Sequence, residues 1–495
     1  MPDMRVRRSC AEGRAPRVAR RLAVLASLLG LTGRVGFARA QDSTAGAAAS
    51  APPAPSAPAE PPREPPPGPH EQLAGLAGER AFLRSPSNEI VLFPSVLLQV
   101  GGAFFPKQQD NLRSGFSLRR ARLELAGWMG SMFYFDVGGD FAPGTDPALP
   151  SGHPPTDAFV AFAPEDDDVF ILQIGQFDAP FSLENRTAEA YTPFIERSLA
   201  VRAVAVPYNK DLGLMVHGTD PARSVYYSAG VFNGEGPELR NADNRFDFVG
   251  RLSVAPLART SIDLLREASL GASAWYGQHV AERPFPQQTT PGGFVIFDPV
   301  WMLGQMATQT LDLRESGSAL TLGGEVNLPI GHRFGLRGEG FFKKQDLDED
   351  SVAADGSTLQ TLGRAKLQAI AGYGEAWVWV LGNDRFLPRP GFELPARLGR
   401  LAEPPAEHGL MLTARGELLK EDLTSTQTLL ADPNLATTRV TTFALAANYW
   451  YGRRVRASLN YVLNLFAGTT ENVKATIATV GKSEQEILLM VAMGL

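Results

Sequence analysis

Short segments that alternate between apolar and polar residues recur along most of the chain. In FSLRRARLELAG (116–127), Arg120, Arg122 and Glu124 share one face and apolar residues occupy the other. MFYFDVGGDF (132–141) alternates in the same way, and no long helical pattern interrupts the series. A soluble sheet also alternates, with its apolar face against a core. Repeated segments of about ten residues instead favour an all-β fold, a transmembrane antiparallel β-barrel with apolar side chains toward lipid and polar ones toward a lumen.

The pattern predicts sixteen strands, an even number that lets the barrel close with both termini in the periplasm. The predicted strands are 89–105, 115–128, 131–142, 157–163, 169–178, 210–218, 224–233, 245–255, 268–278, 318–328, 333–344, 368–382, 409–419, 438–451, 454–464 and 484–495. Short turns and long loops alternate between them, as expected for the periplasmic and outer ends of such a barrel. One connection, Asn383 to His408, is long although it falls on the short-turn side. The apolar closing strand suits recognition by the barrel-assembly machinery.

The N-terminal region predicts export. Residues 1–40 combine several arginines, a short apolar run at 22–32 and the small-x-small sequence Ala38-Arg39-Ala40, which is typical of a cleaved signal peptide. The apolar run is too short to span the ~30 Å hydrocarbon layer of a bilayer. Residues 41–88, rich in Pro and Ala, are expected to form a disordered periplasmic linker, either a spacer or a tether to peptidoglycan or a partner. The barrel domain is then 89–495.

The composition argues against metal-binding, catalytic and nucleic-acid-binding functions. The single cysteine, Cys10, lies in the predicted signal peptide, so the mature chain has neither disulfides nor cysteine ligands for a metal. The six histidines show no metal-like spacing, and no cofactor or catalytic group is indicated. The formal net charge is −6, and residues 1–40 carry nine arginines against Asp3 and Glu12, so the mature chain is acidic. This argues against nucleic acid as a partner.

Charged residues on the polar strand faces are candidates to line the lumen. They are Arg120, Arg122, Glu124, Asp136, Asp140, Arg251, Arg337 and Arg415. Singly, most of them would hydrate the lumen and pair across it, whereas together they would bias the passage of ions. The connection 179–209 is unusually apolar for an outer loop, and we expect it to fold inward as a constriction loop. Its charged candidates, with those at the adjoining strand ends, are Asp178, Arg186, Glu189, Glu196, Arg197, Arg202 and Lys210.

At these residues the chain resembles the phosphate-selective porin family, the porin O and P type. The resemblance rests on FSLRRARLELAG (116–127), IGQFDAPFSLENRT (174–187), ERS (196–198), VFNGEG (231–236), WVWVLGNDRFLPRPGFELP (377–395) and LTARGEL (412–418). It covers roughly residues 90 to 495. It implies a sixteen-stranded barrel in the outer membrane of a Gram-negative bacterium, usually a homotrimer, that passes small anions.

Two departures bear on selectivity. Asp178 stands where the family has a basic residue, and the chain has only eight lysines, although arginine can also bind phosphate in a bidentate way. We therefore expect a passive, non-enzymatic porin for small anionic or neutral solutes, with a weak anion preference and phosphate selectivity left open. The alternative is a structural or adhesive barrel with a plugged lumen and outer loops that bind a partner.

Overall fold

We describe the protein from a computed structural model. The structure describes residues 72–494, apart from gaps at 79, 107–112, 143–154, 165–167, 207–208, 238–239, 242, 281–283, 298–299, 303–308, 354–355, 388, 392–393, 401–406, 426–436 and 469–481. The predicted signal peptide (1–40) and most of the predicted linker (41–88) lie outside the described residues, so these boundaries stay predictions.

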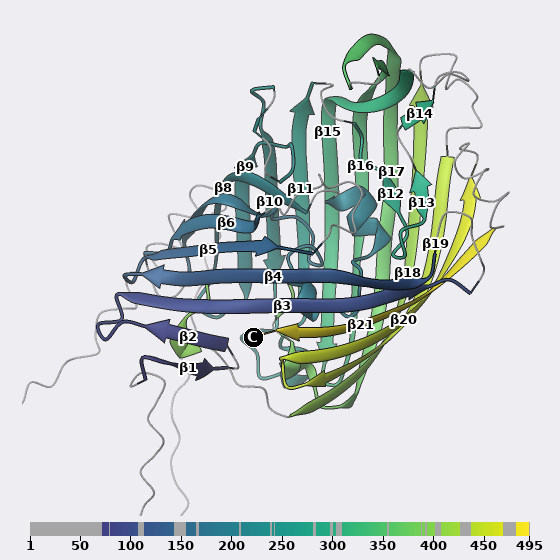
Figure 1. Cartoon of the computed structure of the whole chain (residues 1–495). Helices are drawn as coiled ribbons and strands as arrows, with labels where there is room; N and C mark the ends of the chain where they lie inside the picture. The colour runs from purple at the N-terminus through teal and green to yellow at the C-terminus, as the bar shows by residue number, and fades with distance from the viewer. Residues whose placement is uncertain are drawn as a thin grey trace, which may run out of the picture. The chain divides into compact units, whose positions relative to one another are not determined.

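The alternating segments form one closed antiparallel barrel, and all sixteen predicted strands are confirmed in the described part of the chain (Figure 1). The strands are β3 (Ile90–Phe104), β4 (Gly115–Met129), β5 (Phe133–Asp140), β6 (Pro155–Phe162), β7 (Ile171–Asp178), β8 (Lys210–Thr219), β9 (Val225–Phe232), β10 (Asp247–Val254), β11 (Ser269–His279), β15 (Gln309–Ile330), β16 (Phe334–Ala353), β17 (Thr358–Leu381), β18 (His408–Ser425), β19 (Thr437–Tyr451), β20 (Val455–Gly468) and β21 (Ser483–Gly494). The last strand pairs with the first, Val491 opposite Val100, so the barrel leaves no open edge.

Alternation separates the two faces of the wall as the sequence predicts. On β21, Leu489, Val491 and Met493 are exposed on the outside, whereas Leu488 and Met490 are buried inside. Exposed apolar side chains recur in this way on strands all around the barrel. A soluble protein would not leave so large an apolar surface in water. The outer face is therefore a lipid-facing surface, as in outer-membrane barrels. None of the helices among the described residues is long and apolar enough to cross a membrane.

Strand length varies around the barrel. From β5 to β10 the strands have 8 to 10 residues, whereas from β15 to β19 they have 15 to 24. The long strands extend past the predicted segments: β15 begins at Gln309, where the sequence predicts 318, and β16 ends at Ala353, where it predicts 344. Because β15 and β16 pair with each other almost to these ends, backbone pairing continues the strands into what the sequence presents as loop.

Further small elements accompany the barrel. They are the hairpin β1 (Ala74–Ala77) and β2 (Arg80–Arg84), the pair β12 (Gln288–Thr289) and β13 (Val295–Phe297), the strand β14 (Val300–Met302), and the helical turns η1 (Glu189–Tyr191), η2 (Val201–Ala205), η3 (Asp263–Leu265), η4 (Asp384–Phe386) and η5 (Leu398–Arg400). The hairpin falls within residues predicted as linker. It pairs with β3 through Leu83 opposite Leu92, and its buried Phe82 packs with Phe93 and Trp128.

The connection between β7 and β8 packs on the inner face of the barrel (Figure 1). The backbone N–H groups of Leu183 and Glu184 donate to Glu339 of β16 at 2.8 Å each. Further along, the N–H of Ile195 donates to Asn460 of β20 at 2.8 Å. Apolar residues of this segment, Phe181 and residues 199–206, pack with inward side chains of the wall. We call residues 179–206 the inner segment.

The long connection between β17 and β18 crosses the short-turn end of the barrel. Its Gly391 accepts a hydrogen bond from Arg251 of β10 at 2.6 Å, and its Ala396 accepts one from Trp128 of β4 at 2.7 Å. Its Arg397 pairs with Asp168, between β6 and β7, at 3.3 Å. Strands β4 to β10 lie on the opposite side of the strand order from β17 and β18, so the described residues of this connection span the mouth.

Candidate pore and its arginine cluster

A β-bulge in β4 turns two consecutive arginines inward. Gln99 of β3 pairs with Arg120, and the next residue, Val100, pairs with Leu118, so Arg119 is an extra residue on β4. As a result, Arg119 donates to Ile195 O of the inner segment at 2.8 Å and pairs with Glu196. Strict alternation would place Arg119 opposite Arg120, toward lipid. Sequence reasoning therefore missed Arg119, and a one-residue bulge leaves no signal in the hydrophobic pattern.

Three arginines converge on Glu189 of η1. Arg120 contacts the Glu189 carboxylate at 3.0 and 3.2 Å through Nε and Nη2, and nitrogens of Arg122 and Arg197 lie 3.6 and 3.5 Å from it. We call these four residues the arginine cluster. Burial by itself would raise the pKa of Glu189, but the positive charges of the three arginines outweigh it and hold the pKa well below the ordinary value of a glutamate. Asp140, beside Arg120 and Arg122 at 3.5 and 3.8 Å, also accepts the N–H of Ala121.

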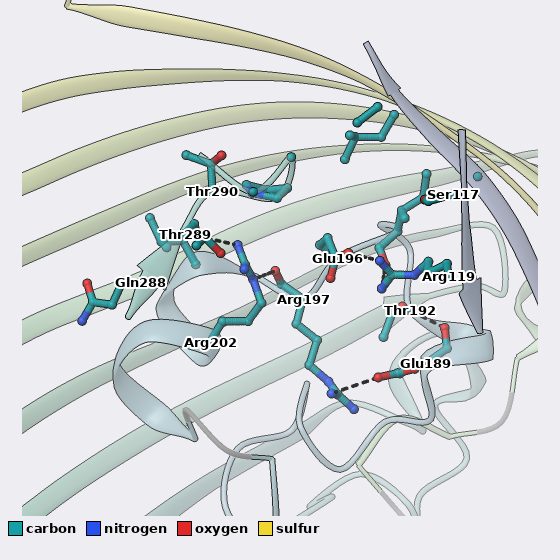
Figure 2. A pocket seen from close by; sticks show the side chains of 18 of the residues that line it. Ser117, Arg119, Glu189, Thr192, Glu196, Arg197, Arg202, Gln288, Thr289 and Thr290 are labelled. Atoms are coloured by element: carbon teal, nitrogen blue, oxygen red, sulfur yellow. Dashed lines mark hydrogen bonds and ion pairs between the residues drawn. The ribbon is translucent and has the colours of Figure 1, made fainter. Parts of the chain in front are cut away.

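A first cavity, of about 250 Å³, opens beside this cluster (Figure 2). Its lining comes from β4, from the inner segment and from residues 286–293. Figure 2 shows Arg197 pointing to Glu189 and Arg202 reaching toward Thr289, whose carbonyl it contacts at 3.1 Å. The charged side chains of the lining are four arginines against two glutamates, namely Arg119, Arg120, Arg197, Arg202, Glu189 and Glu196.

A second cavity, of about 540 Å³, lies on the short-turn side of the same cluster and shares Glu189 and Arg197 with the first. Eight cationic side chains line it against five carboxylates. The cations are Arg80, Arg122, Arg186, Arg197, Lys210, Arg453, Arg454 and Arg456, and the carboxylates are Glu124, Asp136, Asp157, Asp178 and Glu189. The arginine cluster thus lies where the two cavities meet, and cationic side chains outnumber carboxylates on both sides.

Within the second cavity, Asp178 and Lys210 form a group of their own. Lys210 Nζ lies 2.9 Å from both Asp157 and Asp178. Arg186 donates to the backbone carbonyl of Asp178 at 2.6 Å. The acidic residue at 178, which departs from the family pattern, is therefore paired with a lysine from the next strand, and it shares this lysine with Asp157.

The remaining predicted arginines are buried in ion pairs. Arg251 pairs with Glu325 at 2.7 Å. Arg337 and Arg415 share Glu375, and Arg415 also reaches Glu184 of the inner segment at 2.7 Å. Arg251, Arg337 and Arg415 are absent from the linings of the two cavities above. Among the described residues, no group of three His, Cys, Asp or Glu side chains is placed to hold a metal ion.

The fold and this charged lumen define the class of the protein, an outer-membrane porin-like β-barrel. Residues 98–282 match the family model described as phosphate-selective porin O and P, so this part of the chain is similar to that family of outer-membrane channels. The match covers the bulge, the arginine cluster and the inner segment. It does not extend to the later motifs, such as 377–395, on which the resemblance also rests.

The comparison with curated proteins gave no match. Among solved structures, the chain is similar to OmpT of Vibrio cholerae (11% identity, 84% of this chain and 99% of that one, TM-score 0.47). It is also similar to the channel DcaP of Acinetobacter baumannii (9%, 83% and 99%, 0.47) and to an anion-selective porin of Comamonas acidovorans (12%, 82% and 100%, 0.43). At these TM-scores, the likenesses support no further conclusion about this chain.

Proposed function

We propose that the protein is a passive porin through which small anionic or neutral solutes diffuse, with a weak preference for anions. The observation that carries this proposal is the excess of cationic side chains in both cavities on either side of the arginine cluster. Fixed positive charge in a narrow, low-dielectric passage raises the local concentration of anions and lowers that of cations. The carboxylates in the same linings keep the preference weak.

The inner segment would act as the constriction loop. It carries Glu189, Arg197 and Arg202 into the lumen, opposite Arg120 and Arg122 on β4. In this role the loop sets the size limit, and the facing charges set the ion preference. Phosphate selectivity as such has weaker support, because Lys210 is paired with Asp157 and Asp178 and few lysines are available.

By family resemblance we expect a homotrimer in the outer membrane, assembled by the barrel-assembly machinery, with no cofactor. Each protomer would then conduct independently through its own lumen. Cross-linking of the protein in native outer membranes measures the oligomeric state. A single band at the monomer mass at every cross-linker concentration would contradict the trimer.

Conductance in planar bilayers tests the proposed function. We expect discrete open-channel steps, and in a KCl gradient a reversal potential displaced modestly toward that of chloride. A folded barrel that never conducts would instead favour the alternative of a structural or adhesive barrel. A reversal potential on the potassium side would contradict the anion preference.

A further inference from the structure

The carboxylate of Glu189 contacts the guanidinium group of Arg120 in the way that the carboxylate of a bound solute could. Its two oxygens face two nitrogens of one guanidinium at 3.0 and 3.2 Å, the paired arrangement that a planar carboxylate makes with arginine. Glu189 comes from η1 of the inner segment, a single turn that contributes no buried residue, whereas Arg120 and Arg122 are fixed on a barrel strand. A carboxylate on a short turn therefore occupies a preformed arginine site on the wall.

The site offers more donors than Glu189 satisfies. The Nε atoms of Arg122 and Arg197 are buried and have no hydrogen-bond partner among the described residues, and Arg197 is only 8% exposed. The nearest oxygens of Glu189 lie 3.6 and 3.5 Å from these two guanidinium groups, beyond good hydrogen-bond distance. A buried donor without a partner costs free energy, so an additional anionic oxygen that accepts from these donors would stabilise the cluster. The cluster borders both cavities.

Protonation does not release Glu189 from the arginines at neutral or mildly acidic pH. The three arginines keep the pKa of Glu189 well below its usual value, so the side chain stays ionised at neutral and mildly acidic pH. Only another anion can replace it on the arginines. Conduction needs a site that attracts the solute and also releases it, and a resident competitor supplies that release.

We propose that the arginine cluster is a carboxylate-binding site of the pore, in which Glu189 is a resident carboxylate that small permeating carboxylates displace. This inference rests on the proposed porin function. The site already holds a carboxylate, that of Glu189, in a paired arrangement on Arg120, so the carboxylate of a solute can take the same place. Solute oxygens would take the place of Glu189 on Arg120 and would also reach the unpartnered donors of Arg122 and Arg197.

The test compares succinate with inorganic phosphate at pH 8, where the two carry similar charge. Single-channel recordings in KCl measure the concentration of each anion that halves the chloride current. We expect succinate to block the wild-type pore at a lower concentration than phosphate does. In Glu189→Gln, which keeps the shape and removes the competing charge, succinate should block at about tenfold lower concentration.

Controls separate this site from general effects of charge. Glu407→Gln removes an exposed carboxylate at the short-turn end and should leave the succinate block unchanged. Arg122→Gln removes a donor from the cluster and should weaken the succinate block. It provides a second test of the site if Glu189→Gln does not fold. An unchanged succinate block in both Glu189→Gln and Arg122→Gln would overturn the inference, and so would a phosphate block as strong as that of succinate.

A calorimetric titration of the detergent-folded barrel with succinate distinguishes failure of the site from failure of the porin function. If the barrel is silent in bilayers but binds succinate more tightly as Glu189→Gln, the site stands and the porin function fails. If the pore conducts but neither variant changes binding, the site fails alone. If the pore is silent and no binding is seen, both proposals are overturned.

Discussion

The two walls of the barrel use the same residue types in different ways. On β4, Arg120 and Arg122 keep side-chain exposures of 23% and 17%, and most of their carboxylate contacts are long, at 3.5 to 3.8 Å. On β10 to β18, Arg251 and Arg415 meet carboxylates at 2.7 to 2.9 Å, and their side chains are 0% and 2% exposed. Both sets of arginines point inward from strands with the same alternation.

The inner segment accounts for the difference. Its first part, Leu183 and Glu184, packs against Glu339 of β16 and Arg415 of β18, and it covers these buried charges. Both cavities open toward β4, where the charges stay in contact with water. Arg120 and Arg122 can therefore interact with passing ions, whereas arginines such as Arg415 hold the inner segment in place. Alternation along the strand determines whether a side chain points to the lumen or to lipid. Whether an inward arginine then faces a cavity or is buried in an ion pair depends on where the inner segment covers the wall.

Replacing Arg415 by Ala should give the largest effect, a loss of stability. It would leave the buried carboxylates of Glu184 and Glu375 without their cation, and removing one member of a buried ion pair typically costs about 3–5 kcal/mol. Unfolding by guanidinium in detergent, followed by tryptophan fluorescence, measures the change. Arg120→Ala is the matched variant on the other wall and should cost less than about 1 kcal/mol, since its ion pairs are partly solvated. Equal losses would contradict the division of the two walls.

Gly391→Ala should loosen the connection that crosses the short-turn mouth. Gly391 has φ +70°, and a Cβ would lie 2.6 Å from Arg251 Nη2, which is packed against Glu325. The left-handed conformation alone costs an L residue about 1–2 kcal/mol. We expect faster proteolysis within residues 383–407 of the folded barrel.

The control for this variant is Gly356→Ala. Gly356 also has positive φ, at +84°, but a Cβ there meets nothing within 4 Å. It should show the backbone cost alone and leave proteolysis at 383–407 unchanged. If the two variants behave alike at 383–407, contact with Arg251 does not fix the connection.

The sequence predicted the strands well because each lipid-exposed strand must alternate, and β21 shows this with Leu489, Val491 and Met493 outside. It did not predict that β15 and β16 extend beyond the apolar pattern. Outside the lipid-facing part of a strand, backbone pairing does not require apolar and polar residues to alternate. The hairpin β1–β2 was also missed, because its buried apolar residues are few, Ala77 and Phe82.

For the candidate site, the sequence named the residues of the arginine cluster but not their grouping. Arg120 and Arg122 followed from alternation, and Glu189 and Arg197 from the apolar character of the loop. That these four meet depends on where the loop crosses the lumen, which local sequence does not determine. Arg119 was missed because the bulge opposite Gln99 breaks the period-two alternation of β4.

Arg119→Ala should shift ion selectivity about as much as Arg120→Ala. Each removes one positive charge from the lining of the first cavity, and we expect the anion-to-cation permeability ratio to fall about twofold, a small effect because salt screens lumen charges. Reversal potentials in a KCl gradient measure the ratio, and the double variant Arg120→Ala, Arg122→Ala should lower it further. Arg364→Ala, at an 85% exposed side chain on β17, is the control. An unchanged ratio in Arg119→Ala would place that residue toward lipid.

The smallest effect is expected from pH. The folded-state pKa of Glu189 is depressed, so its negative charge and its ion pairs are fully present above the ordinary glutamate pKa of about 4.3 and are lost only as pH falls through the lower folded value. The difference in reversal potential between wild type and Glu189→Gln isolates this one group from every other charge in the lumen. It should stay constant from pH 8 to pH 5 and shrink only at pH values well below the ordinary glutamate pKa. If the difference disappeared between pH 7 and pH 5, Glu189 would be titrating as an unpaired or merely buried carboxyl group, and the three arginines would not form the cluster on which the contrast between the walls depends.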